Sequence, residues 1–158
     1  MVALVRVDDR LIHGQVTAVW CRAWNLDRII VVDDEVAADP FMQEVYRLAA
    51  PSGIQVQVVS LEDAVPLLRR EAENGGHRTM VLLRSVAGAV ALYEQGFSFP
   101  ALNVGGIGMG PGRRPLWRNI AASPQEIALL ERLAQRGVEV TLQPVPDDRP
   151  VPLADLVG

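Results

Sequence analysis

The chain has 158 residues, of which 49% are hydrophobic, and its formal net charge is −4. This size suits one domain with a single substantial core, and the mild acidity argues against a nucleic-acid-coating protein. All 15 positively charged side chains are arginines. Schiff-base chemistry and a Walker-type phosphate loop both need lysine, so those mechanisms are excluded.

No apolar run approaches the roughly 20 residues that a membrane-spanning helix needs. Residues 1–9 are too short a segment, and too quickly charged, for a signal peptide. The single cysteine, Cys21, has no internal partner for a disulfide, which fits a reducing compartment. We therefore expect a cytoplasmic protein.

The first part of the chain alternates short apolar runs with helical patterns. The run "ALVRV" (3–7) predicts a strand, and "QVTAVWCRAW" (15–24) predicts a helix after it. The β-branched run at 28–33 is typical of a strand buried on both faces. An aspartate cap followed by proline predicts a helix over 40–50, and the alternating run "IQVQVV" (54–59) predicts a third strand.

The middle of the chain continues this alternation. The sequence "SLED" opens a helix in which Pro66 predicts either a later start or a kink. The run "RTMVLLR" (78–84) predicts a fourth strand. A helix over 86–95 follows, closed by Gly96, and "ALNVG" (101–105) predicts a fifth strand.

The last part begins with "PLWRNIAA" (115–122), which predicts a shorter sixth strand. The sequence "SPQE" (123–126) is a capping box with proline at the first helical position, and its helix is expected to end at Gly137. The run "VEVTLQ" (138–143) predicts a last strand. The proline-rich tail 144–152 is expected to be extended, with a short final helical turn.

This alternation, without a repeat or a linker, predicts one α/β domain over residues 1–158. Its sheet is expected to be open, twisted and mostly parallel, with helices on both faces. In such sheets, ligands bind at the carboxyl ends of the strands, near a topological switch point. The segments that follow the predicted strands are 8–14, 33–39, 60–63, 84–88 and 105–114.

His13 follows the first predicted strand and directly precedes a helix N-terminus. Free backbone N–H groups and the helix dipole favour an anion there, and Gly14 lets a bulky group approach the backbone. Arg10 offers a planar fork that matches phosphate oxygens. Such surroundings suit a phosphohistidine carrier, whose neutral ring attacks a phosphoryl group. The alternative is a structural or merely exposed histidine.

Acidic residues gather after the first two strands. They are Asp8, Asp9, Asp33, Asp34 and Glu35. One interpretation is a Mg²⁺ pocket, as in receiver domains. The other is that they cap helices, pair with Arg6, Arg10 and Arg28, and face solvent. One aspartate can also orient Arg10 or the ring N–H of His13.

The glycine-rich stretch "GGIGMGPG" (105–112) lacks the spacing of a nucleotide-binding loop. We expect a mobile loop beside the site that carries Arg113 and Arg114. Those two side chains touch a phosphoryl group or a partner, or they face solvent. Arg84, at the end of the fourth strand, is a further candidate phosphate contact.

The remaining candidate residues give weaker indications of function. His77 is expected in an exposed loop. Two histidines and one cysteine, widely spread, make no metal-ligand set, so no metal or other cofactor is expected. Trp20 and Trp24 lie four residues apart on the first helix, which predicts core packing or, alternatively, a partner-docking patch.

The segment "VRVDDRLIHGQV" closely resembles the signature of the IIB subunit of the bacterial phosphotransferase system, mannose/fructose/sorbose family. The similarity continues through "TAVW", "RIIVVDDEVAADPF" and "LNVGGIG" and covers essentially the whole chain. It implies an α/β domain with a mainly parallel sheet, in agreement with the pattern of elements. The segments "LLRSVAG" and "GMGPGRRPLWRN" depart from the sequences typical of relatives.

The resemblance also implies site residues. His13 corresponds to the residue that is phosphorylated, at Nδ1, and Arg10 to an arginine that is important for the transfer. We further expect phosphate-binding or supporting roles for a set around them: Asp8, Asp9, Gly14, Gln15, Arg84 and Arg113. No metal or other cofactor is implied.

The function implied is that of a sugar phosphotransferase component. His13 would accept a phosphoryl group, originally from phosphoenolpyruvate, from a phosphohistidine of a IIA subunit or domain. It would pass the group to a sugar during uptake through the membrane subunits IIC and IID. The protein would then be cytoplasmic and peripherally associated with the membrane transporter.

Two other functions stay open. A receiver-like regulatory module would use an Asp8, Asp9 and Asp33 pocket with Mg²⁺ and an aspartyl phosphate. It needs an acceptor aspartate at the end of the third strand and a lysine at the end of the fifth, whereas the third strand here ends "VVSLED" and no lysine exists. A non-catalytic sugar-phosphate-binding protein would bind its ligand without a covalent label.

Overall fold

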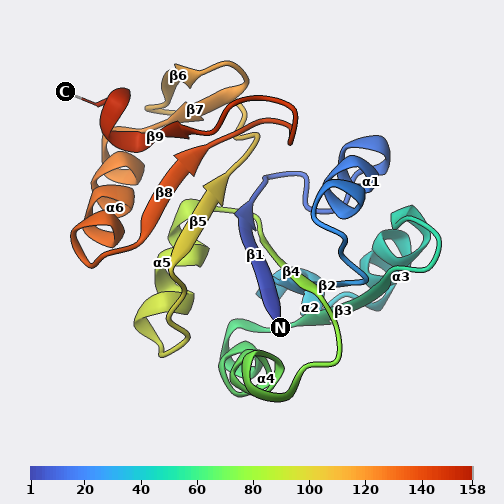
Figure 1. Ribbon diagram of the computed structural model, residues 1–158. Coiled ribbons are helices and arrows are strands. Elements are labelled where there is room, and N and C mark those ends of the chain that lie inside the picture. The colour runs from blue at the N-terminus through green and yellow to red at the C-terminus, as the bar shows by residue number, and fades with distance from the viewer. Residues whose placement is uncertain (158) are drawn as a thin grey trace.

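A seven-stranded sheet runs through the molecule in the computed structural model, which describes residues 1–157 (Figure 1). The strands lie in the order β3-β2-β4-β1-β5-β8-β9. Their bounds are Val2–Val7 (β1), Arg28–Val32 (β2), Gln55–Val59 (β3), Thr79–Leu83 (β4), Ala101–Val104 (β5), Glu139–Leu142 (β8) and Val151–Pro152 (β9). All neighbouring pairs are parallel except β8 and β9, so β1 is a central strand of a mostly parallel sheet.

Helices cover both faces of this sheet. Their bounds are Gly14–Ala23 (α1), Asp34–Ala37 (α2), Pro40–Ala49 (α3), Leu61–Asn74 (α4), Val86–Glu94 (α5) and Pro124–Gln135 (α6), with a 3₁₀ turn at Leu153–Asp155 (η1). One core cluster joins the sheet to α1 and α3, and the other joins it to α4, α5 and α6. The predicted fold class is therefore confirmed.

The β2 strand shows how the sequence builds these two cores. Successive side chains of a strand point to opposite faces. Ile29 and Val31 accordingly enter the cluster with Trp20 of α1, whereas Ile30 and Val32 enter the cluster on the other face. A strand that is buried on both faces is apolar throughout, which is why this run reads as continuous rather than alternating.

The structure differs from the expected elements at three places. The run at 115–122 is not one strand but a separate antiparallel hairpin of β6 (Arg114–Trp117) and β7 (Ile120–Ala122). The short helix α2 was not predicted. The helix α4 does not start late, because Ser60 caps the Asp63 amide and Pro66 lies inside the helix. Among residues 1–157, no helix is both long and apolar enough to cross a membrane.

Candidate functional site

The loop after β1 lies at the carboxyl end of a central strand, between β4 and β5 (Figure 1). Backbone hydrogen bonds hold it on both sides, from Asp8 N–H to the Leu83 carbonyl (3.0 Å) and from Asp9 N–H to the Gly106 carbonyl (2.9 Å). Leu11 takes a left-handed conformation (φ 56°), yet its side chain is buried. Burial of Leu11 thus offsets a backbone strain of about 1–3 kcal/mol and fixes the shape of the loop.

His13 directly precedes the first residue of α1, and its backbone N–H donates to Thr17 Oγ1 (3.0 Å). Its ring lies between two acceptors: Nδ1 is 3.2 Å from the Leu11 carbonyl oxygen, and Nε2 is 3.9 Å from Asp8 Oδ2. Nε2 is buried and has no hydrogen-bond partner within residues 1–157, although 19% of the side chain is exposed. Solvent therefore does not reach the ring at Nε2.

Behind the His13 ring there is little space. The cavity there measures about 10 Å³ and is lined by residues that include Arg6, Asp8 and Thr17. That is about the volume of one water molecule. A reacting group must therefore arrive from outside the loop.

Gly14 and Gln15 form the exposed first turn of α1. Gly14 has φ +51°, and a Cβ there would meet open space, so the positive φ rather than crowding favours glycine. The His13 side chain makes no capping hydrogen bond to this turn in the described part of the chain. His13 therefore leaves the first N–H groups of α1 without a side-chain cap, as an anion site at a helix N-terminus requires.

Asp8 is the buried anion of the site. Its side chain is 2% exposed and lies near Arg6 Nη2 (3.5 Å), Arg10 Nε (3.7 Å) and His13 Nε2. The Arg10 backbone N–H also donates to Asp8 Oδ1 (3.1 Å). The Arg10 side chain is 53% exposed, so it can reach a group bound outside. The structure thus brings Asp8, Arg10 and His13 together.

Arg6 was expected only as a partner of the acidic residues, yet it adjoins the site through Asp8. It is 1% exposed, its guanidinium lies 4.2 Å from the centre of the Trp20 ring, and it donates to the carbonyl oxygens of Gln143 and Pro144. Burial lowers the pKa of Arg6 to about 10, and the charge of Asp8 opposes this shift. An arginine inside the apolar run "ALVRV" was the sequence signal, because a buried charge in a central strand needs a partner.

Asp9 and Arg113 hold the glycine-rich loop. Asp9 Oδ2 accepts from the Gly108 N–H (2.8 Å), and Arg113 Nη1 donates to the Gly108 carbonyl (3.0 Å). Arg113 also forms two hydrogen bonds with Glu126 of α6 (2.9 and 3.1 Å), which raise the pKa of Arg113. Arg113 is therefore engaged with α6 and the loop.

Arg84 lies apart from His13, after β4. Its guanidinium pairs with Asp33 (3.2 Å), and Asp33 also caps α2 by accepting from the Val36 N–H (3.0 Å). Asp34 accepts from the Leu61 N–H (2.8 Å). Asp33 and Asp34 thus accept hydrogen bonds from backbone N–H groups, and Asp33 also pairs with an arginine, as the second interpretation of the acidic residues expects. Within residues 1–157, no three or more Asp, Glu, His or Cys residues gather as a metal-ligand set.

The two tryptophans and the second histidine lie in different surroundings. Trp20 is buried in the core at 1% exposure, as expected, whereas Trp24 is 37% exposed. His77 is partly exposed and lies 3.3 Å from Asp27, at the amino end of β4. His77 is therefore remote from the loop that holds His13.

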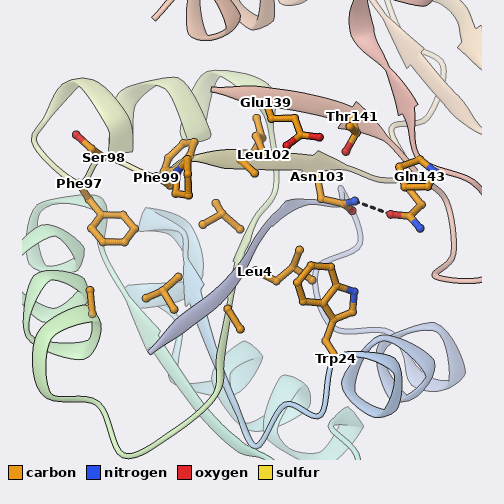
Figure 2. Close-up of a pocket in the computed structure, with 17 residues that line it drawn as sticks. Leu4, Trp24, Phe97, Ser98, Phe99, Leu102, Asn103, Glu139, Thr141 and Gln143 are labelled. Atoms are coloured by element: carbon orange, nitrogen blue, oxygen red, sulfur yellow. Dashed lines mark hydrogen bonds between the residues drawn. The ribbon is translucent and has the colours of Figure 1, made fainter. Parts of the chain in front are cut away.

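A larger cavity, of about 350 Å³, opens on the sheet near β1, β5 and β8 (Figure 2). Its lining includes Trp24, Phe99, Asn103 and Gln143, but none of Asp8, Arg10 and His13. Asn103 donates to Gln143 Oε1 (2.9 Å), a bond that Figure 2 shows at the wall of the cavity. The Asn103 side chain also accepts a hydrogen bond from Arg6, so this wall of the cavity adjoins the buried side of the site.

Comparison with known proteins agrees with this architecture. The family model described as "PTS system sorbose subfamily IIB component" matches residues 2–158. The sorbose-specific EIIB component of Klebsiella pneumoniae is 35% identical over 157 residues, which cover 99% of this chain and 95% of that protein. The mannose-specific EIIAB component of Escherichia coli K12 is 32% identical over the whole chain, and the chain spans 49% of its length.

Solved structures show the same similarity. The IIBSor domain of the sorbose permease from Klebsiella pneumoniae superposes with a TM-score of 0.90, at 35% identity, over 99% of this chain and 96% of that domain. The N-acetylgalactosamine-specific IIB component 1 from Escherichia coli gives 0.89 at 27% identity, over 96% and 98% of the two chains. The chain therefore belongs to the sorbose-subfamily IIB components of the phosphotransferase system.

Proposed function

We propose that His13 accepts a phosphoryl group from the phosphohistidine of a IIA protein and passes it to a sugar. The observation that carries this proposal is the placement of His13 in a half-exposed loop with Asp8 behind Nε2 and Arg10 beside it. Membership of the IIB family supports a sugar phosphotransferase role. A single histidine can serve both steps, because in each step one bond to phosphorus forms as another bond to phosphorus breaks.

The proposed reacting atom is Nδ1, because Nε2 is buried. Attack requires the ring proton on Nε2 and the lone pair on Nδ1, and the Asp8 carboxylate, 3.9 Å from Nε2, is proposed to favour that form by its charge. That lone pair bonds to phosphorus as the bond from the donor nitrogen breaks, and the donor regains its free ring. In the second step a sugar oxygen takes the phosphorus, the Nδ1 bond breaks, and the hydroxyl proton is released.

Nδ1 lies 3.2 Å from the Leu11 carbonyl, so the ring must turn away from that oxygen to react. The exposed Arg10 and the N–H groups of Gly14 and Gln15 are proposed to bind the phosphoryl oxygens, since oriented donors stabilise such charge. Asp9 is proposed to support them through the glycine-rich loop. Arg84 and Arg113 are proposed to act from the surroundings, through their carboxylate partners.

The partners follow from the same proposal. The similarity to about half of a mannose-specific EIIAB component supports a IIA donor, either separate or joined to this chain. The acceptor sugar would be held by the membrane subunits IIC and IID during uptake. We propose that the protein works in the cytoplasm, peripherally attached to that transporter, and that the transfer needs no metal or other cofactor.

The test is reconstitution with labelled phosphoenolpyruvate, the general carrier proteins and a IIA protein. We expect a label that is stable in alkali and lost in acid, as phosphohistidine is, and that chases to sugar when membranes holding IIC and IID are added. His77→Ala is the matched control for His13→Ala, since the chain has 2 histidines. An alkali-labile label would indicate an acyl phosphate and contradict the proposal, as would bound sugar phosphate without any covalent label.

A further inference from the structure

Two arginines lie beside Asp8, and they differ in their freedom to move. Arg10 is 53% exposed and 3.7 Å from Asp8. Arg6 is 1% exposed and is fixed by the ring of Trp20, the side chain of Asn103 and the carbonyls of Gln143 and Pro144. Only Arg10 can leave Asp8 for a group outside the loop.

Gly105 shows how closely the fold encloses Arg6. A Cβ at Gly105 would lie 2.2 Å from Arg6 Nη2 and 2.5 Å from its Cζ, so no other residue fits there without moving the guanidinium. Gly105 N–H donates to the Val7 carbonyl (2.7 Å), which holds this part of the chain against β1. The first glycine of the glycine-rich stretch thus makes room for Arg6.

The charges around Asp8 must change when a phosphoryl group arrives. A phosphoryl group brings a charge of about −1.5 to −2 at neutral pH. If Arg10 moves to it, Asp8 keeps one neighbouring arginine, at 3.5 Å. A buried carboxylate without a cation is costly, and it would draw Arg10 back.

We propose that Arg6 is a positioning residue for phosphoryl transfer, an inference that rests on the proposed function of His13. By holding the charge of Asp8, Arg6 leaves Arg10 free for the phosphoryl oxygens. Arg6 itself touches neither the phosphoryl group nor the His13 ring.

The first test is a double-mutant cycle of Arg6 with Arg10, read as the rate of labelling from a phosphorylated IIA protein. If Arg6→Met ties Arg10 to Asp8, adding Arg10→Ala should cost much less in Arg6→Met than in the wild type. An equal cost of Arg10→Ala in both backgrounds would overturn the proposal.

The second test measures the transfer from a phosphorylated IIA protein. We expect Arg6→Met to lower kcat by about 10–100-fold, less than the loss of a direct donor to the developing charge, with KM for the IIA protein unchanged. Arg6→Lys should recover part of the loss. The double variant Arg6→Met with Asp8→Asn should be faster than Arg6→Met, because it removes the unpaired charge.

Matched controls come from a partly buried pair at the amino end of the sheet, where Arg28 lies 2.7 Å from Glu71. Arg28→Met and Glu71→Gln also break an ion pair, but they should leave kcat unchanged. An equal loss of kcat in Arg28→Met would reduce the role of Arg6 to stability and overturn the proposal. The failures are distinguishable, because a wild type that takes no label contradicts the function of His13, whereas the comparison of Arg6→Met with Arg28→Met judges Arg6 alone.

Discussion

At the scale of single residues, burial separates the supporting groups of the loop from the reacting ones. Asp8 and Arg6 are almost wholly enclosed, whereas Arg10 is 53% and His13 19% exposed. The enclosed pair is rigid and holds its charges at low dielectric, where electrostatic interactions are strong. The exposed pair is left to meet a partner protein.

Arg10→Ala should slow phosphoryl transfer without destabilising the fold. The loss expected for one donor to a developing negative charge is about 100-fold and at most about 1000-fold. Quenched-flow measurement of the label on the protein gives the rate. Replacement of the exposed Arg22 on α1, in Arg22→Ala, is the control. A wild-type rate in Arg10→Ala would remove its assigned role.

Gly105→Ala should displace Arg6, because the added Cβ would lie 2.2 Å from the guanidinium. Overpacking of this kind costs about 1–3 kcal/mol in the free energy of unfolding. Urea denaturation measures that loss. Gly76→Ala is the control, since a Cβ there meets nothing within 4 Å; equal stability of the two variants would contradict the enclosure of Arg6.

The sequence predicted most of the neighbours of His13 but not their pairing. Asp8, Arg10 and Gly14 are local in the chain, so their proximity follows from the loop itself. Arg84 and Arg113 were expected at the phosphate, yet they pair with Asp33 and Glu126. Arg6 depends on carbonyls of residues 143 and 144, and such distant contacts leave no local pattern.

At the scale of elements, helix starts were predictable because capping is local chemistry. The capping box of α6 forms as expected, with the Ser123 hydroxyl accepting from the Glu126 N–H and the Glu126 carboxylate accepting from the Ser123 N–H. The hairpin of β6 and β7 was missed because Arg118, not a glycine, takes the left-handed turn position (φ 48°). The run at 115–122 therefore reads as unbroken.

The same box supports a prediction of pH dependence. Burial alone would raise the pKa of Glu126, but hydrogen bonds from Arg113 and Ser123 outweigh it and lower the pKa. A lowered pKa in the folded state gives stability that is present above the unfolded value of about 4.5 and is lost as the pH falls below it. Glu126→Gln should cost about 1 kcal/mol near neutral pH.

Urea denaturation of the wild type and Glu126→Gln across the acid range measures this difference. The difference in unfolding free energy should shrink below pH 4.5. Glu131→Gln, on the exposed side of the same helix, should show no such trend. A difference between wild type and Glu126→Gln that is constant with pH would rule out this contribution.

At the scale of the whole molecule, one sheet separates two cores. Because β1, β2 and β4 contribute side chains to both clusters, neither face can lose its packing without exposing the other side of the same strands. The fold class was predictable from the alternation of strands and helices. The strand order was not, because local periodicity does not determine which strands become neighbours.

This shared sheet predicts a single cooperative unfolding transition. Trp20 lies in the cluster with α1, and Trp117 packs against the cluster on the other face. We therefore expect one midpoint from both probes in each of the variants Trp20→Phe and Trp117→Phe. The thermal midpoint measured by tryptophan fluorescence should equal the midpoint measured by far-ultraviolet circular dichroism on the same variant. Separate midpoints for the two probes would show that the two faces unfold independently.

The most direct test of the proposed function is the identity of the atom that carries phosphorus. The wild-type protein, labelled through phosphoenolpyruvate, the general carriers and a IIA protein, is digested at neutral to alkaline pH and mapped by mass spectrometry, with phosphorus-31 NMR on the intact chain. We predict one phosphoryl group, on Nδ1 of His13, and none in His13→Ala, while His77→Ala is labelled like the wild type. Phosphorus on any other residue, or retained label in His13→Ala, would contradict the proposed role of His13.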